Sequence, residues 1–78
     1  MDVKPISRAL LISILSRHEP SLLAVLNEPN PARPDILRVL DAVDTEMATY
    51  GFDDQYSPTT YGLMLEELVD EVNRIGFT

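Results

Sequence analysis

The apolar residues of this 78-residue chain recur at helical spacing, and in two segments they form a narrow stripe. Within each stripe the apolar positions alternate steps of four and three residues, which places them on one side of an α-helix. The first stripe consists of Ile36, Leu40, Val43, Met47 and Tyr50, and the second of Tyr61, Leu65, Leu68, Val72 and Ile75. No segment alternates apolar and polar residues for long enough to predict a strand. The spacing therefore predicts an all-α fold.

Prolines mark the predicted helix starts, because proline fits the first helical turn and disfavours helix at the residue before it. We predict a first helix over 5–18, a short second helix over 21–27 and a third over 34–50. Ser57 is the predicted cap of a fourth helix that reaches Ile75. Three prolines between the second and third helices predict a stiff connector there.

Two glycines carry specific expectations about the ends of the long helices. Gly51 follows the third helix, where glycine can adopt the left-handed conformation that ends a helix, and Phe52 is then placed to fold back on Met47. Gly62 lies inside the fourth helix, where it costs about 1 kcal/mol relative to alanine. Either the helix effectively starts after Gly62, or another helix approaches closely at that point.

The two striped helices are predicted to lie side by side, since such stripes pack at about 20° in antiparallel hairpins and small bundles. The connection between them is short, and the first two helices would cover the exposed side of the pair. We therefore predict one helical domain over 1–78. Its predicted architecture is a small four-helix bundle with a short second helix and an antiparallel hairpin of helices three and four.

Composition excludes several classes of protein. The chain has no cysteine and one histidine, so disulfides, thiolate sites and His-rich metal sites are excluded, and we expect no metal and no cofactor. A chain this short buries only about 60–65% of its unfolded surface, which favours a second subunit or a partner. The apolar run over 9–15 is too short to cross a bilayer, and no signal-peptide cleavage site follows it. We expect no membrane association and a cytoplasmic location.

The sequence contains no pattern that is typical of catalysis. No serine lies in a Gly-x-Ser-x-Gly elbow, and no glycine-rich phosphate loop is present. Asp53 and Asp54 do not begin a calcium loop, because glycine and glutamate are missing at the sixth and twelfth positions. His18, at the end of the first helix, is predicted to have a structural role. We expect that the protein is not an enzyme.

Negative charge is concentrated in the second half of the chain. The net charge is −7, and beyond Val39 nine acidic residues are opposed only by Arg74. Direct nucleic-acid binding is not expected, since phosphate contacts need clustered Lys and Arg. An acidic surface instead attracts a basic partner.

Two groups of side chains are candidates for partner binding. The first is a set of carboxylates spaced along the fourth helix, opposite its apolar stripe, with one leucine among them. The second surrounds the turn between the last two helices. The predicted partner-binding residues are Leu63, Glu66, Glu67, Asp70, Glu71, Asp53, Asp54 and Tyr56. The alternative interpretation of the carboxylates is a solvated outer face that keeps the protein soluble.

These features favour a small non-catalytic acidic helical protein that binds a basic surface of another protein. Inhibitors, immunity proteins and antitoxins, including those of phage type, suit this size and charge. One alternative is a homo-oligomeric structural or assembly component, such as a homodimer, with Ile12 and Arg8 on the second face of the first helix as the self-association contact. Another alternative is a DNA mimic whose carboxylates imitate phosphates and occupy a nucleic-acid-binding protein.

Overall fold

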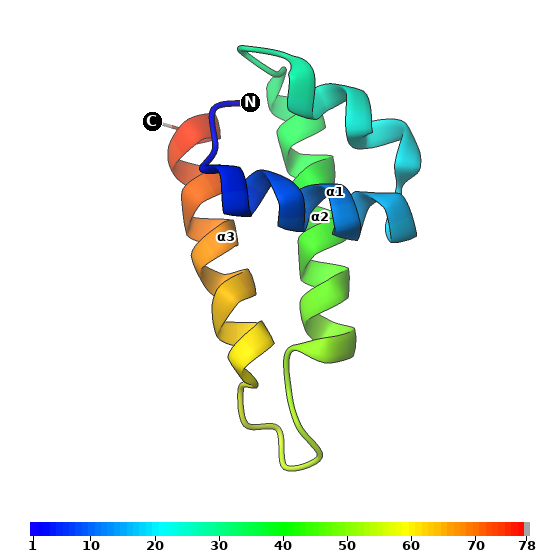
Figure 1. Ribbon diagram of the computed structural model, residues 1–78, viewed down its shortest axis with the longest axis vertical. Coiled ribbons are helices and arrows are strands. Elements are labelled where there is room, and N and C mark those ends of the chain that lie inside the picture. The colour runs from blue at the N-terminus through cyan, green and yellow to red at the C-terminus, as the bar shows by residue number, and fades with distance from the viewer. Residues whose placement is uncertain (78) are drawn as a thin grey trace.

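The computed structural model describes residues 1–77, which form three α-helices and one 3₁₀-helix (Figure 1). The elements are α1 (Pro5–His18), η1 (Pro20–Asn27), α2 (Arg33–Tyr50) and α3 (Thr60–Phe77). Residues 1–77 contain no strand, apart from an isolated antiparallel bridge between Phe52 and Pro58. The prediction of an all-α fold is confirmed, and α1 has the predicted bounds.

The helices are arranged as a pair with a third helix across it. α2 and α3 lie side by side and are joined at one end by the loop over 51–59, while α1 crosses both (Figure 1). η1 packs against α1 and α2. Because residues three apart share an edge of a 3₁₀-helix, Leu22 and Val25 both reach the core from this short segment.

The hydrophobic core combines residues from all four helices. The apolar side chains that are completely buried are Leu11, Ile14, Leu15, Val39, Val43, Leu65 and Val72. Each such side chain contributes about 1.5–3 kcal/mol relative to an exposed position. This core holds α1 across the α2–α3 pair.

The two predicted stripes differ in how well they match the buried faces of their helices. In α3 the stripe is buried at its centre, through Leu65, Leu68 and Val72. In α2 the buried face is broader than the stripe and includes Val39 and Glu46, because α1, η1 and α3 all pack on this helix.

The ends of the long helices differ from the predictions. Gly51 has φ −83°, so the left-handed cap predicted there is wrong, and Phe52 remains exposed. α3 begins at Thr60, and its first turn is capped by Thr59, whose Oγ1 accepts a hydrogen bond from the Gly62 amide at 2.9 Å. The cap predicted at Ser57 is wrong because the bridge between residues 52 and 58 holds that segment in a turn.

Gly62 lies against the backbone at the end of α2. A Cβ atom at Gly62 would lie 2.9 Å from the carbonyl carbon of Gly51 and 3.0 Å from its Cα. Real Cβ atoms almost never approach backbone so closely. Of the two explanations that the sequence allows for Gly62, the close approach is therefore the one observed, and Gly51 is the residue that it meets.

Candidate functional site

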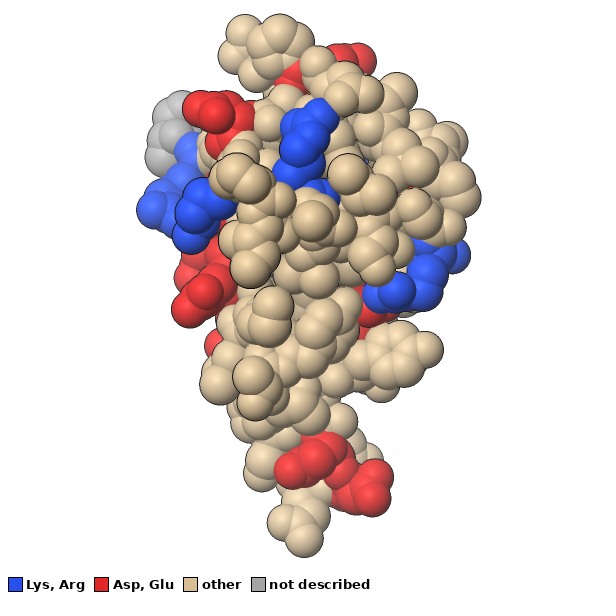
Figure 2. Space-filling model, viewed as in Figure 1, with Lys and Arg blue, Asp and Glu red and all other residues tan. Residues whose placement is uncertain are grey.

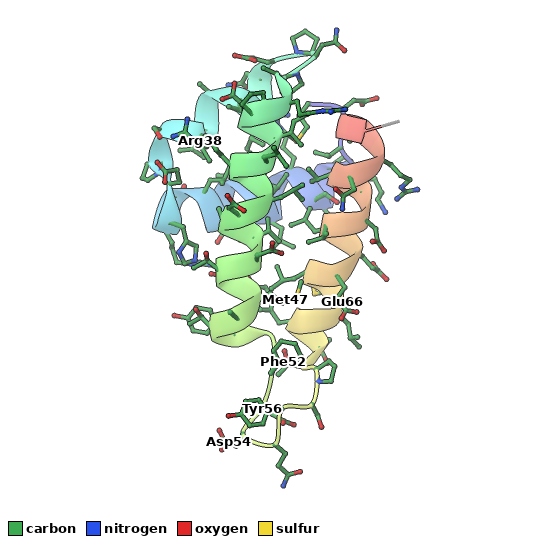
Figure 3. All side chains as sticks on the ribbon, turned by 180° about the vertical axis from the view of Figure 1, so that it is seen from behind. Arg38, Met47, Phe52, Asp54, Tyr56 and Glu66 are labelled. Carbon is green, nitrogen blue, oxygen red and sulfur yellow. The ribbon has the colours of Figure 1, made fainter. Side chains whose placement is uncertain are left out.

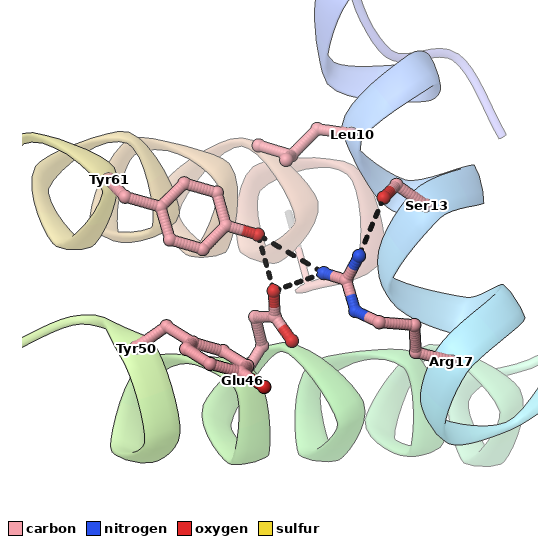
Figure 4. Close-up of a pocket in the computed structure, with 6 residues that line it drawn as sticks. All are labelled: Leu10, Ser13, Arg17, Glu46, Tyr50 and Tyr61. Carbon is pink, nitrogen blue, oxygen red and sulfur yellow. Dashed lines mark hydrogen bonds and ion pairs between the residues drawn. The ribbon is translucent and has the colours of Figure 1, made fainter.

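The structure contains a buried carboxylate that the sequence did not single out. Glu46, in the middle of α2, has 0% exposure. Its Oε2 accepts hydrogen bonds from Arg17 of α1 and from the Tyr61 hydroxyl of α3, the latter at 2.5 Å (Figure 4). Its Oε1 lies 2.7 Å from Nε2 of His18. One side chain thus joins three helices.

The protonation equilibria of this cluster follow from its contacts. Burial raises the pKa of Glu46, but hydrogen bonds from Tyr61, His18 and Arg17 outweigh it and hold the pKa below the ordinary value. Burial, followed by the hydrogen bond to Glu46, raises the pKa of Tyr61. The hydrogen bond to Glu46 raises the pKa of Arg17. Glu46 is therefore ionised at neutral pH and paired with a guanidinium.

An open depression of about 500 Å³ lies beside this cluster, between α1 and the α2–α3 pair (Figure 4). Its lining residues are Leu10, Ser13, Arg17, Glu46, Tyr50 and Tyr61. Both oxygens of Glu46 already contact side chains of the protein, and Arg17 also donates to Ser13 at 3.0 Å. The hydrogen bonds of Glu46 therefore connect α2 to α1 and α3, and the cluster stabilises the packing of these three helices.

A signal for Glu46 was present in the sequence. Glu46 stands three residues after Val43 and seven after Val39, so it shares their side of α2. The stripe predicted for α2 contained apolar residues only, and Glu46 was counted among the acids of the second half of the chain. Its partners on α1 and α3 are too distant in the chain to be inferred from spacing.

Glu71 is a second carboxylate that is used inside the protein. It is 8% exposed, accepting hydrogen bonds from the backbone amide of Lys4 at 2.7 Å and from Ser7 Oγ at 2.5 Å. Burial raises the pKa of Glu71, but the hydrogen bonds from Ser7 and Lys4 outweigh it and lower the pKa. The prediction that Glu71 lies on the solvent face is wrong, because the start of α1 packs there and a carboxylate satisfies its free amides.

The other three carboxylates of α3 are exposed, as expected. Glu66, Glu67 and Asp70 face solvent, and Leu63 among them is 52% exposed. We call these four residues the α3 outer face. Figure 3 shows Glu66 on the side of α3 that faces away from α2.

The predicted residues of the turn lie in the loop over 51–59, at the end of the molecule opposite the N-terminus and the last turn of α3 (Figures 1 and 3). The Asp53 carboxylate accepts hydrogen bonds from the amides of Gln55 at 2.8 Å and Ser57 at 3.0 Å, which closes the turn. Asp54 is exposed, and Tyr56 is 87% exposed. Acidic atoms are visible at this end of the surface in Figure 2.

Tyr56 holds a strained backbone conformation, which makes a test possible. Its φ of 61° lies in the left-handed region, which disfavours residues with a Cβ by about 1–2 kcal/mol. We expect Tyr56→Gly to raise the free energy of unfolding by about 1 kcal/mol, as measured by urea denaturation. Gln55→Gly is the control: φ at Gln55 is not positive, so this variant should not gain stability. If Tyr56→Gly is no more stable than the wild type, the positive φ of Tyr56 does not destabilise the folded protein.

The two residues of the predicted self-association contact have different roles. Ile12 is exposed on α1, as expected. Arg8 instead donates to the Leu26 carbonyl at 2.8 Å and to Asn27 Oδ1 at 2.6 Å. Its guanidinium fastens η1 to α1, so Arg8 is not free for a second chain.

Residues 1–77 contain neither a metal-ligating cluster nor a helix that could span a membrane. Within this range no group of three or more His, Asp or Glu side chains is placed to hold a metal ion. No helix in the same range combines the length and the hydropathy needed to traverse a bilayer.

Residues 1–77 form a small all-α fold in which the carboxylates of Glu46 and Glu71 are buried and one face of α3 is acidic. No protein-family model, curated protein or solved structure matches this chain.

Proposed function

We propose that this protein is a small, acidic, non-catalytic helical protein that binds a basic surface of another protein through the α3 outer face. The observation that carries the proposal is the position of Leu63, half exposed among the carboxylates of Glu66, Glu67 and Asp70. An exposed apolar side chain next to charges of one sign on the same helix face suits a contact that combines apolar packing with charge pairing. Charges of this kind speed association with a partner of opposite sign.

The arrangement of the helices supports this use of α3. We propose that α2 and α3 act as an antiparallel hairpin that keeps the α3 outer face rigid, within a small helical bundle that also includes α1 and η1. The loop residues Asp53, Asp54 and Tyr56 extend the acidic surface at one end of the hairpin. A protein of this kind would act by occupying its partner, as inhibitors, immunity proteins and antitoxins do.

A protein partner is favoured over the DNA-mimic alternative by the apolar residues on the same helix. A phosphate mimic needs carboxylates in series along an elongated face. On α3 the exposed carboxylates are confined to residues 66–70, the exposed apolar residues Leu63 and Met64 lie in the turn before them, and Glu71 is withdrawn into the protein. These features suit a mixed apolar and charged contact.

Charge reversal on α3 tests the proposal. We expect that a tagged double variant Glu66→Lys and Glu67→Lys loses at least about 90% of the partner protein that the wild type captures from a cell extract at low salt. Capture by the wild type should also weaken as salt is raised, because exposed charges are screened. The measurement is quantitative mass spectrometry of the captured proteins.

The matched control places the same charge change on another helix. Asp41 and Asp44 are exposed on α2, so Asp41→Lys with Asp44→Lys alters the net charge equally. This control should retain the captured protein. If both double variants lose capture equally, net charge alone is responsible; if neither loses it, the α3 outer face is not the binding surface.

A further inference from the structure

A groove between α1 and α3 adjoins the α3 outer face. It has a volume of about 170 Å³ and is lined by residues from both helices. Its apolar walls include Ile6 and Leu10 from α1, and Met64 and Leu68 from α3. We call it the α1–α3 groove.

Two apolar side chains at this groove are unusually exposed. Ile6 is 68% exposed and Met64 is 41% exposed, although both line the same groove. In Figure 2 the middle of this face, beneath α1, consists of uncharged residues. Exposed apolar groups that are gathered in this way mark interaction sites more often than isolated ones do.

Charge is placed at the edge of the groove. Glu67 belongs both to the α3 outer face and to the groove lining, and within residues 1–77 its carboxylate takes part in no hydrogen bond or ion pair. Glu71 also lines the groove, but its oxygens are already bound to α1. Lys4 lies on the rim as well. A cation entering the site is therefore attracted to the Glu67 side and repelled by Lys4.

We infer that the α1–α3 groove receives one apolar side chain, of about the size of leucine or methionine, carried by a partner protein next to a Lys or Arg that pairs with Glu67. The volume suits one side chain of this size, and the uncharged walls favour an apolar group. The exposed carboxylate of Glu67 in the lining favours a positive charge beside that side chain. This inference rests on the proposed function and names the chemistry that the partner must present.

The three methionines of the chain supply a direct readout. With ¹³C-labelled methionine methyl groups, the protein should show signals from Met1, Met47 and Met64 only. The probe is a synthetic alanine-rich helical peptide with one leucine and a lysine four residues away on either side. We expect the Met64 signal to shift and to saturate at about 1 mM peptide, while the signals of Met1, which is in the core, and of Met47, which packs against the core, stay in place.

Matched peptides and protein variants complete the test. A peptide with alanine in place of leucine should bind about tenfold more weakly, and so should the Ile6→Ala protein. A peptide with glutamate in place of the lysines should not shift Met64. Ile12→Ala is the control, since Ile12 is exposed on α1 but does not line the groove.

The failure of this inference can be told apart from the failure of the proposed function. If Met64 does not shift, or if Ile6→Ala binds the leucine peptide as tightly as the wild type does, the groove is not the receiving site. The proposed function would still stand if the double variant Glu66→Lys, Glu67→Lys lost its captured partner while the control double variant Asp41→Lys, Asp44→Lys retained it. If that variant kept its partner, the proposed function would fail.

Discussion

Replacing Gly62 with alanine is expected to destabilise this protein strongly, although alanine is the better helix former. Helix propensity alone predicts that the change inside α3 stabilises by about 1 kcal/mol. The new Cβ, however, would lie 2.9 Å from the carbonyl carbon of Gly51, and backbone atoms cannot move aside as a flexible side chain can. We expect a net loss of about 2–3 kcal/mol, which lowers Tm by roughly 10–20 °C in calorimetry or thermal circular dichroism.

The expected sign makes this experiment decisive. Asn73→Ala is a suitable control, since residue 73 is exposed on the same helix and should gain a few tenths of a kcal/mol from propensity. A Gly62→Ala protein more stable than the wild type would show that α3 does not approach the end of α2 as described.

Removing the Glu46 carboxylate is expected to have an effect of similar size. Glu46→Ala leaves Arg17, His18 and the Tyr61 hydroxyl without their shared acceptor and opens a cavity between three helices. The Arg17 side chain is 47% exposed, so most of the cost comes from the buried cavity and from the donors left without an acceptor, together about 3 kcal/mol. We expect a loss of about 3 kcal/mol in the free energy of unfolding, measured by urea denaturation at pH 7.

Asp44→Ala is the control for this loss, because Asp44 is exposed two residues away on the same helix. Such a surface change should stay within about 0.5 kcal/mol. A small effect of Glu46→Ala, comparable with that of the control, would mean that the cluster contributes little to stability.

The same carboxylate predicts a pH dependence with a definite sign. The pKa of Glu46 in the folded protein lies below the ordinary value of 4.5. The stabilisation of the folded state by ionised Glu46 is therefore present above pH 4.5, and it is lost as the pH falls through the pKa of the folded protein. The pKa of Glu71 is also lower in the folded protein than its ordinary value. Wild-type stability should therefore fall as the pH drops below about 4.5, and the stability of Glu46→Gln should fall by less. Parallel curves for the two proteins would contradict the assignment.

Local sequence carried much of the secondary structure. Pro5 begins α1 at the position that its fixed φ favours, and the stripe from Tyr61 to Ile75 correctly identified the buried side of α3. These features depend on residues a few positions apart, where propensity and periodicity act directly. The turn over 52–58 was misjudged because a contact between Phe52 and Pro58 overrides the local capping preference of Ser57.

For the candidate site too, the features set by local spacing were predicted correctly, and those set by distant contacts were not. Leu63, Glu66, Glu67 and Asp70 were correctly placed on an exposed face, because exposure opposite an apolar stripe follows from helix geometry alone. The burial of Glu71 was missed because its partners, Lys4 and Ser7, stand more than sixty positions earlier in the chain.

The sequence by itself determined that this chain forms helices, where most of them begin and which side of α3 is buried. Only the tertiary structure decided that α1 crosses the α2–α3 pair. Because α1 crosses the pair, Glu46 and Glu71 accept hydrogen bonds from α1, and the α1–α3 groove forms between the two helices. The physical reason is that helix formation is governed by neighbouring residues, whereas a buried charge or a groove depends on which distant side chains packing brings within hydrogen-bond reach.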